Sequence, residues 1–338
     1  MTINKPIFFE PNRVSRVYTG GKLFADFFGD NSEDGYFPEE WIASSVEALK
    51  GKDLSSNNGL SKVKGTDILF KDLLENNKKD MIGDCNELGF LTKILDSSIR
   101  LPVQAHPDKA FSRKYFNSEY GKAECWIVLD TRPNAKLYFG FKDGVIKEDF
   151  IAAIEKSETD KTAMVSLVKE IPVQKGDVFF IPPKEVHAIG AGCLILEILE
   201  PTDFTVEPEA WCGDYRLNDE EMFCGLPFDV AMECFNFGTD CNPKRQPKII
   251  EETDEYVYEE LIGKTDTDCF GVNRIKLNNG KFTLRAAPGV YVVTEGSGTI
   301  GGKIIKKGDY FFHPYCLDGK CIVSTDLSIE LVECFKKN

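Results

Sequence analysis

Four residues in the first two thirds of the chain have side chains that commonly bind divalent metals. Gln104 and His106 are two positions apart, a spacing that on a β-strand points both side chains to one face. Glu124 begins an apolar segment, where it shares a face with Lys122. His187 follows a proline turn, and a hairpin there would return it to the same interior. Two imidazoles, a carboxylate and an amide form a ligand set suited to zinc, with one or two positions open for water or substrate.

The residue types alone leave the metal and the site open. Imidazole binds zinc, iron and nickel alike, so other divalent metals are alternatives to one zinc ion per chain. Each of the four residues, taken by itself, is more often structural or ion-paired than metal-binding, and only their combination favours a site. The third histidine, His313, has no such companions and is expected to be structural.

Strands should dominate the elements that position these residues. Short β-branched and aromatic runs bounded by Gly, Pro, Asn and Asp predict them. The clearest runs are residues 126–130, 136–139, 177–181, 194–198, 265–276, 281–284, 290–294, 303–305, 309–312 and 327–332. Helical periodicity is local and predicts short helices over 67–75, 108–116 and 145–155, the last with Asp143 as its N-cap.

One segment of the chain is echoed later in the sequence. Gly-Asp-Val-Phe-Phe-Ile-Pro-Pro at 176–183 resembles Gly-Asp-Tyr-Phe-Phe-His-Pro-Tyr at 308–315. A repeated turn, aromatic strand and proline turn predicts two copies of one β unit. We therefore expect a mainly β protein with two jelly-roll β-barrel domains, residues 1–240 with short helical insertions and residues 241–338. The second copy has Gly319 where the first has His187, so the second domain is expected to bind no metal.

Charge and composition exclude several classes of partner. The 338 residues include 41 Lys and Arg against 55 Asp and Glu, a net charge of −14. Such a surface repels phosphate backbones and anionic lipids, so neither nucleic acid nor a membrane is an expected partner. The sequence contains no long apolar run and no signal-peptide core. Its eleven cysteines are irregularly spaced without a CxxC pair, which indicates reduced thiols and a cytoplasmic protein.

These segments together resemble the type I phosphomannose isomerases, zinc-dependent cupins that interconvert mannose 6-phosphate and fructose 6-phosphate. The order Gln-x-His-Pro, Lys-x-Glu, then Gly-Asp and a proline turn before His-Ala is specific to that family. The resemblance covers residues 15–205 well and the rest of the chain at the level of architecture. The segments that carry it are residues 18–23, 28–29, 40–44, 90–96, 101–108, 121–126 and 176–188.

The resemblance implies a metal-dependent aldose–ketose isomerase that acts through a cis-enediol. The four residues introduced above would be the metal ligands. Lys93 and Lys122 would line the sugar-phosphate pocket, and Glu197 would be a pocket carboxylate and candidate base, with Lys93 as its rival. Asp203 would match an aspartate of the substrate site. The implied partner is a small sugar phosphate, and the implied assembly is a monomer or a weak homodimer.

Two positions depart from the family pattern. Family members usually have a catalytic arginine four residues after that aspartate, where this chain has Glu207, and Pro102 replaces a family serine. A negative charge at this position of the substrate site would repel a phosphorylated sugar. Either Arg100 or Arg216 folds back to substitute, or Glu207 is a surface residue outside the pocket. A related cupin isomerase for a different or non-phosphorylated sugar, or a non-catalytic sugar-binding cupin, is therefore an alternative.

Overall fold

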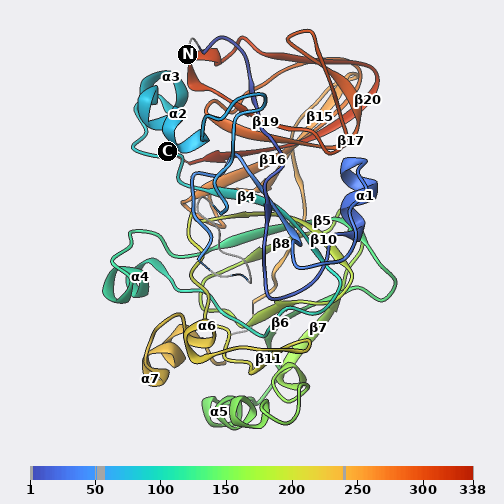
Figure 1. Cartoon of the computed structure of the whole chain (residues 1–338). Helices are drawn as coiled ribbons and strands as arrows, with labels where there is room; N and C mark the ends of the chain where they lie inside the picture. Colours follow the sequence, from blue (N-terminus) through green and yellow to red (C-terminus); the bar gives the residue numbers. More distant parts are fainter. Residues whose placement is uncertain (1–2, 50, 52–57, 239–240, 338) are drawn as a thin grey trace.

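The computed structural model describes residues 3–49, 51, 58–238 and 241–337. Two large antiparallel sheets dominate, and the helices are short (Figure 1), so the expected mainly β architecture is confirmed. Among the described strands, neither large sheet closes on itself by hydrogen bonding. No helix in this part of the chain is long and apolar enough to cross a membrane.

The first sheet has seven strands and carries several of the residues selected above for chemistry. In spatial order these are β13 (Lys244–Arg245), β8 (Val178–Ile181), β5 (Glu124–Thr131), β10 (Cys193–Leu199), β4 (Leu91–Ser97), β3 (Glu39–Ile42) and β2 (Arg13–Val14). Every residue of β10 and β4 is buried, including the charged Lys93, Asp96 and Glu197.

A smaller sheet lies against the first and brings His187 toward it. Its strands are β7 (Val168–Pro172), β6 (Lys136–Phe141) and β9 (His187–Ile189). Leu137 and Ile189 of this sheet share an apolar cluster with Trp126 and Ile195 of the first sheet. A separate hairpin pairs β11 (Trp211–Cys212) with β12 (Tyr215–Arg216).

The C-terminal sheet repeats the strand order of the first. It contains β1 (Ile7–Phe8), β19 (Tyr310–His313), β17 (Gly289–Ile300), β20 (Ile322–Lys336), β16 (Phe270–Thr283), β15 (Tyr256–Ile262) and β14 (Lys248–Glu252), with β18 (Lys303–Lys306) beside β17. The echoed segments form β8 and β19, which hold the same place in the two orders.

Strands cross the proposed division of the chain in both directions. β1 pairs with β19 of the C-terminal sheet, and β13 pairs with β8 of the first. Buried side chains of both sheets, such as Ile94 and Val332, belong to one apolar cluster. The division at residues 240 and 241 therefore stays a prediction.

The described residues form short helices and 3-10 turns between the strands. The helices are α1 (Lys22–Phe28), α2 (Phe70–Asn76), α3 (Lys78–Ile82), α4 (Lys109–Tyr115), α5 (Lys147–Lys156), α6 (Asp219–Phe223) and α7 (Phe228–Ala231), with 3-10 turns at Val165–Leu167, Met232–Cys234 and Tyr315–Leu317. The three expected helices are α2, α4 and α5, each within a few residues of its predicted bounds.

The predicted N-cap of α5 is wrong. Ile146 takes that position because the Asp149 carboxylate accepts a hydrogen bond from its backbone N–H at 3.1 Å. Asp143 forms an ion pair with Lys169 at 3.0 Å instead.

Candidate active site

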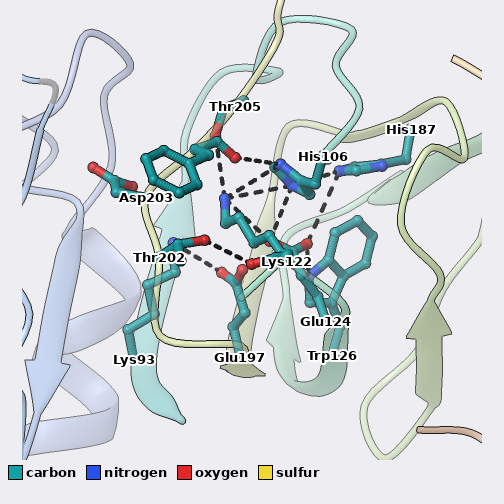
Figure 2. Close-up of polar contacts among 12 residues, drawn as sticks. Lys93, His106, Lys122, Glu124, Trp126, His187, Glu197, Thr202, Asp203 and Thr205 are labelled. Atoms are coloured by element: carbon teal, nitrogen blue, oxygen red, sulfur yellow. Dashed lines mark hydrogen bonds and ion pairs between the residues drawn. The ribbon is translucent and has the colours of Figure 1, made fainter. Parts of the chain in front are cut away.

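Three of the predicted metal ligands, His106, Glu124 and His187, come together where β5, β9 and the segment before α4 meet (Figure 2). Glu124 begins β5 and His187 begins β9. The backbones of Gln104 and His187 exchange two hydrogen bonds of 2.9 Å, which form an isolated antiparallel bridge. This bridge holds His106, two residues after Gln104, beside the second histidine.

Two imidazoles and one carboxylate form a compact buried group. His106 Nε2 lies 3.0 Å from Glu124 Oε1 and 3.2 Å from His187 Nε2. Glu124 Oε2 lies 3.9 Å from His187 Nε2. None of the three side chains is more than 2% exposed, and one potential ligand atom from each lies within 4.8 Å of the others.

The hydrogen bonds behind the two rings direct their lone pairs at each other. His106 Nδ1 lies 3.1 Å from the carbonyl oxygen of Phe204, and His187 Nδ1 lies 2.8 Å from that of Glu185. A carbonyl oxygen only accepts, so these contacts favour a proton on Nδ1 of each ring, while Glu124 Oε1 competes for a proton on Nε2 of His106. With both protons on Nδ1, the two Nε2 lone pairs and the Glu124 carboxylate would face a bound cation.

This donor set fits a zinc ion. Tetrahedral zinc with Zn–N bonds of about 2.0–2.1 Å holds its ligand nitrogens roughly 3.4 Å apart, close to the observed separation of 3.2 Å. Burial lowers the pKa of His106 to about 3, with Lys122 adding to this effect and Glu124 opposing it. His106 is therefore neutral at physiological pH, as a metal ligand must be. The side chain of Gln104 lines the same pocket, and its place among the ligands stays a prediction.

The two predicted lysines are buried beside carboxylates. Lys122 Nζ lies 3.3 Å from Glu124 Oε1 and donates a hydrogen bond to Thr205 Oγ1 at 3.2 Å. Lys93 and Glu197 are directly paired between β4 and β10, and their Nζ and Oε2 atoms are 3.2 Å apart. The structure therefore brings Glu197 and both lysines to the predicted metal ligands (Figure 2).

The surroundings of Lys93 and Glu197 decide which of the two is suited to act as a base. Burial alone lowers the pKa of Lys93, but Glu197 and Glu39 outweigh burial and raise it above its ordinary value. Burial raises the pKa of Glu197, Glu124 raises it further, and Lys93 opposes this. Of the two candidate bases, Glu197 is the better suited, because Lys93 stays protonated at neutral pH.

Sequence reasoning missed a buried arginine in the pocket wall. Arg16 is 6% exposed, and its Nη1 and Nη2 lie 3.1 and 3.2 Å from the two carboxylate oxygens of Asp203. Its Nε lies 3.0 Å from Glu39 Oε2, and Tyr18 donates a hydrogen bond to Glu39 Oε1 at 2.7 Å. Arg16 lies two residues before the segment 18–23 that carried the resemblance, but no spacing ties it to Asp203.

Glu207 lies in the pocket and is not a surface residue. It is 7% exposed and lines the pocket together with the substrate-site candidates. Neither proposed substitute for the family arginine is there. The Arg100 guanidinium forms two hydrogen bonds with Glu209, at 2.6 and 2.8 Å, and Arg216 forms an ion pair with Glu158.

The pocket is more acidic than a site for a phosphorylated sugar would suggest. Its empty volume is about 660 Å³, including its open mouth. Its charged lining residues are three cations and six carboxylates: Arg16, Lys93, Lys122, Glu39, Glu124, Glu197, Asp203, Glu207 and Glu221. The apolar part of its wall includes Leu95, Leu101, Pro102, Trp126 and Ile189.

Comparisons with known proteins agree with this geometry. A model of the catalytic domain of type I phosphomannose isomerases matches residues 52–124. A Bacillus subtilis (strain 168) protein named probable mannose-6-phosphate isomerase GmuF is 30% identical over 308 residues, which are 90% of this chain and 89% of that protein.

Solved structures share the fold. The mannose 6-phosphate isomerase of Bacillus subtilis superposes with a TM-score of 0.75 and 22% identity, over 97% of this chain and 99% of that one. A mannose 6-phosphate isomerase bound with zinc and yttrium superposes with a TM-score of 0.71 and 12% identity, over 99% and 100% of the two chains. From the sequence match over nine tenths of its length, this chain belongs to the type I phosphomannose isomerase family.

Proposed function

We propose that this chain is a metal-dependent aldose–ketose isomerase that interconverts mannose 6-phosphate and fructose 6-phosphate. The observation that carries the proposal is the buried His106, Glu124 and His187 group, with the Glu197 carboxylate and two lysines in the same pocket. Membership of the family and the names of the relatives support the same reaction.

One zinc ion per chain is the proposed cofactor. Gln104, His106, Glu124 and His187 would hold it. When bound, zinc would supply Lewis-acid stabilisation of the negative charge that develops on the sugar oxygens. The zinc in a structure of the same fold supports this choice over other divalent metals.

The chain's own residues account for the proton transfer and the positioning of the sugar. The reaction moves a proton from C2 of the aldose to C1 through a cis-enediol. Glu197, as its carboxylate, would take the proton from C2 and return it to C1. Lys93 would orient that carboxylate, and Lys122 would donate a hydrogen bond to a sugar oxygen. Asp203 fixes Arg16 in the pocket wall, where the guanidinium would attract the substrate phosphate.

Metal analysis and a coupled mannose 6-phosphate assay test this function, with Glu197→Gln as the decisive variant. We expect about one zinc per chain and turnover in the wild type. Glu197→Gln should keep its zinc and lose turnover by roughly 10²–10⁴-fold, because an amide cannot take the proton. The matched control, Glu155→Gln on the exposed face of α5, should match the wild type. A zinc-loaded wild type without turnover would reject the proposal.

The charge of the pocket favours one second candidate. With three cations and six carboxylates, the lining suits a sugar with less negative charge than a phosphorylated one. An isomerase of a non-phosphorylated aldose would then turn over mannose with a higher kcat/KM than mannose 6-phosphate. The same coupled assay with both sugars decides between the two candidates.

The assembly and the location of the chain remain proposals too. We propose a cytoplasmic monomer or weak homodimer, and the eleven irregularly spaced cysteines without a CxxC pair support the cytoplasmic location. Size-exclusion chromatography with light scattering tests the assembly, and fractionation of the native cells tests the location.

A further inference from the structure

The C-terminal sheet has a buried polar centre at the position that corresponds to the catalytic pocket. In the first sheet, Glu197 on β10 is paired with Lys93 on the next strand, β4. In the C-terminal sheet, β20 and β16 hold the corresponding places, and Glu333 is paired with Asn273. Both carboxylates are buried in the middle of their sheets, at 2% and 0% exposure.

The neighbouring strands extend the correspondence. On the other side of each carboxylate stands an aromatic residue, Trp126 beside Glu197 and Tyr291 beside Glu333. One strand further out, the register puts Tyr258 of β15 where the first sheet has Glu39. A cluster of polar and aromatic side chains thus occupies the same site in both sheets.

The second cluster is closely hydrogen-bonded around its carboxylate. Tyr291 donates to Glu333 Oε2 at 2.9 Å, and Asn273 donates to Glu333 Oε1 at 2.8 Å. The hydroxyl of Tyr258 also donates to Glu333 Oε1. These three donors and its complete burial hold the Glu333 carboxylate in place, and Glu333 in turn holds the Tyr258 hydroxyl.

This cluster cannot copy the metal site. The register puts Gly289 at the place of Glu124, and a Cβ there would lie 2.7 Å from the carbonyl oxygen of Ala286. His313, beside it on β19, has both ring nitrogens within 3.1 Å of carbonyl oxygens, those of Ala286 and Leu317. The C-terminal cluster therefore keeps a buried polar centre but lacks the ligands to bind zinc.

A cavity opens directly onto the cluster. Glu333 and Tyr258 belong to its lining, and its empty volume is about 1520 Å³ including its open mouth. The segment after α3 covers one side of it with residues such as Asp84 and Asn86. The charged lining residues are Arg285, Lys336, Lys337, Asp84 and Glu333, which give an excess of one positive charge in a chain of net charge −14.

We propose that this C-terminal cavity is a second, metal-free binding site for a phosphorylated monosaccharide. Tyr258, held in place by Glu333, would contact the sugar at the floor, and the rings of Tyr315 and Phe335 would contact the C–H faces of the sugar. Arg285, which forms an ion pair with Glu251 in this structure, would exchange that partner for the phosphate, with Lys336 and Lys337 beside it. The ligand class follows from the cavity's own side chains, so the site does not depend on whether the catalytic pocket acts on the same sugar.

Counting bound ligand in two ways tests the second site. Equilibrium dialysis with radiolabelled fructose 6-phosphate counts every site on the full chain, whether or not the sugar is isomerised. Tryptophan fluorescence reports only on the first site, because all three tryptophans, Trp41, Trp126 and Trp211, lie outside the C-terminal sheet. We expect dialysis to give about two equivalents per wild-type chain and fluorescence to follow one of them.

Substitutions in the C-terminal cavity test whether the second equivalent of sugar phosphate binds there. Arg285→Ala and Glu333→Gln should each weaken it by about tenfold or more, while the fluorescence titration and kcat stay unchanged. Lys306→Ala, which removes an exposed charge from the same sheet outside the cavity, should retain both equivalents.

Three results would overturn the proposal: a single equivalent in the wild type, two undiminished equivalents in both cavity variants, or displacement of the second equivalent by inorganic phosphate as readily as by the sugar phosphate. Displacement by fructose at the same concentration would show that the second site binds the sugar without its phosphate, and would overturn the phosphorylated ligand. Turnover is measured separately, so a failure of the proposed reaction leaves the dialysis result interpretable.

Discussion

Arg16 and Asp203 form a two-point ion pair between residues 187 positions apart in the chain. Both side chains are almost fully buried, and the backbone N–H of Leu49 donates a third hydrogen bond to the same carboxylate at 2.9 Å. The pair joins the N-terminal segment to the loop after β10, and the pocket lies between the two. It therefore contributes both to the fold and to the charge of the pocket.

Asp203→Asn should destabilise the protein strongly. The amide leaves the Arg16 charge buried with only part of its compensation, and breaking a buried pair costs about 3–5 kcal/mol. Urea unfolding followed by circular dichroism measures the change. The control is Arg113→Ala on α4, which breaks an exposed ion pair with Glu119. This variant should unfold at nearly the wild-type urea concentration. Equal effects of the two substitutions would show that the buried pair has no special role.

The same ion pair should make stability depend on pH at the acid end. Burial alone raises the pKa of Asp203, but Arg16 and the two pocket lysines outweigh it, and the net pKa lies well below its usual range. Because the folded-state pKa is depressed, this stabilisation is complete above about pH 4 and is lost as the pH falls below that value.

The difference in unfolding free energy between the wild type and Asp203→Asn should therefore be constant from about pH 5 to 7 and shrink below about pH 4. Urea unfolding over this pH range measures it. A difference that grows on acidification would contradict the assigned direction of the shift.

His106→Asn should abolish tight zinc binding, whereas His313→Asn should not. The two histidines are similarly buried, but His106 faces Glu124 and His187, while both nitrogens of His313 lie close to carbonyl oxygens. Metal analysis after dialysis separates the two roles. We expect His313→Asn to retain zinc and unfold at lower temperature, because it loses a buried hydrogen bond. Loss of zinc from His313→Asn alone would refute the ligand assignment.

Glu207→Arg should raise kcat/KM for mannose 6-phosphate by about tenfold or more, because it replaces a repulsive charge in a buried pocket by an attractive one. The effect should be absent with mannose, which has no phosphate. Steady-state assays with both sugars measure it, and Glu155→Arg on the exposed face of α5 controls for the change in net charge. An equal gain with both sugars would show that position 207 does not act on the phosphate.

The sequence predicts that His106, Glu124 and His187 come together, because the signals for this are local. Gln104 and His106 are separated by one residue, and the prolines at 182 and 183 mark the turn before His187. Strand pairing then needs only to bring Glu124 beside them, which the apolar pattern of β5 and β10 already favours. The echo of β8 in β19 likewise reveals a repeat that the strand order displays.

Long-range pairing is what the sequence does not reveal. Nothing near Arg16 indicates that its partner is Asp203, and nothing near Glu333 indicates that Tyr258 and Tyr291 surround it. Arg16 and Asp203 lie outside the strands, in segments that only the whole fold brings together. The Glu333 cluster depends on the register of strands far apart in the chain, and a shift of one residue would turn its side chains to the opposite face. The raised pKa of Lys93 is likewise not evident from the sequence, since its carboxylate neighbours lie on other strands.

The pairing of β1 with β19 has a consequence for synthesis on the ribosome. Ile7 is paired with Phe312, so the first strand of the chain is made about 300 residues before its partner, an interval of roughly 15–60 s at ordinary translation rates. During that time the unpaired N–H and C=O groups of β1 are available to other chains, and a chaperone or the growing first sheet must shield them. Nascent chains stalled before residue 310 should therefore expose this strand to proteases, whereas completed chains protect it.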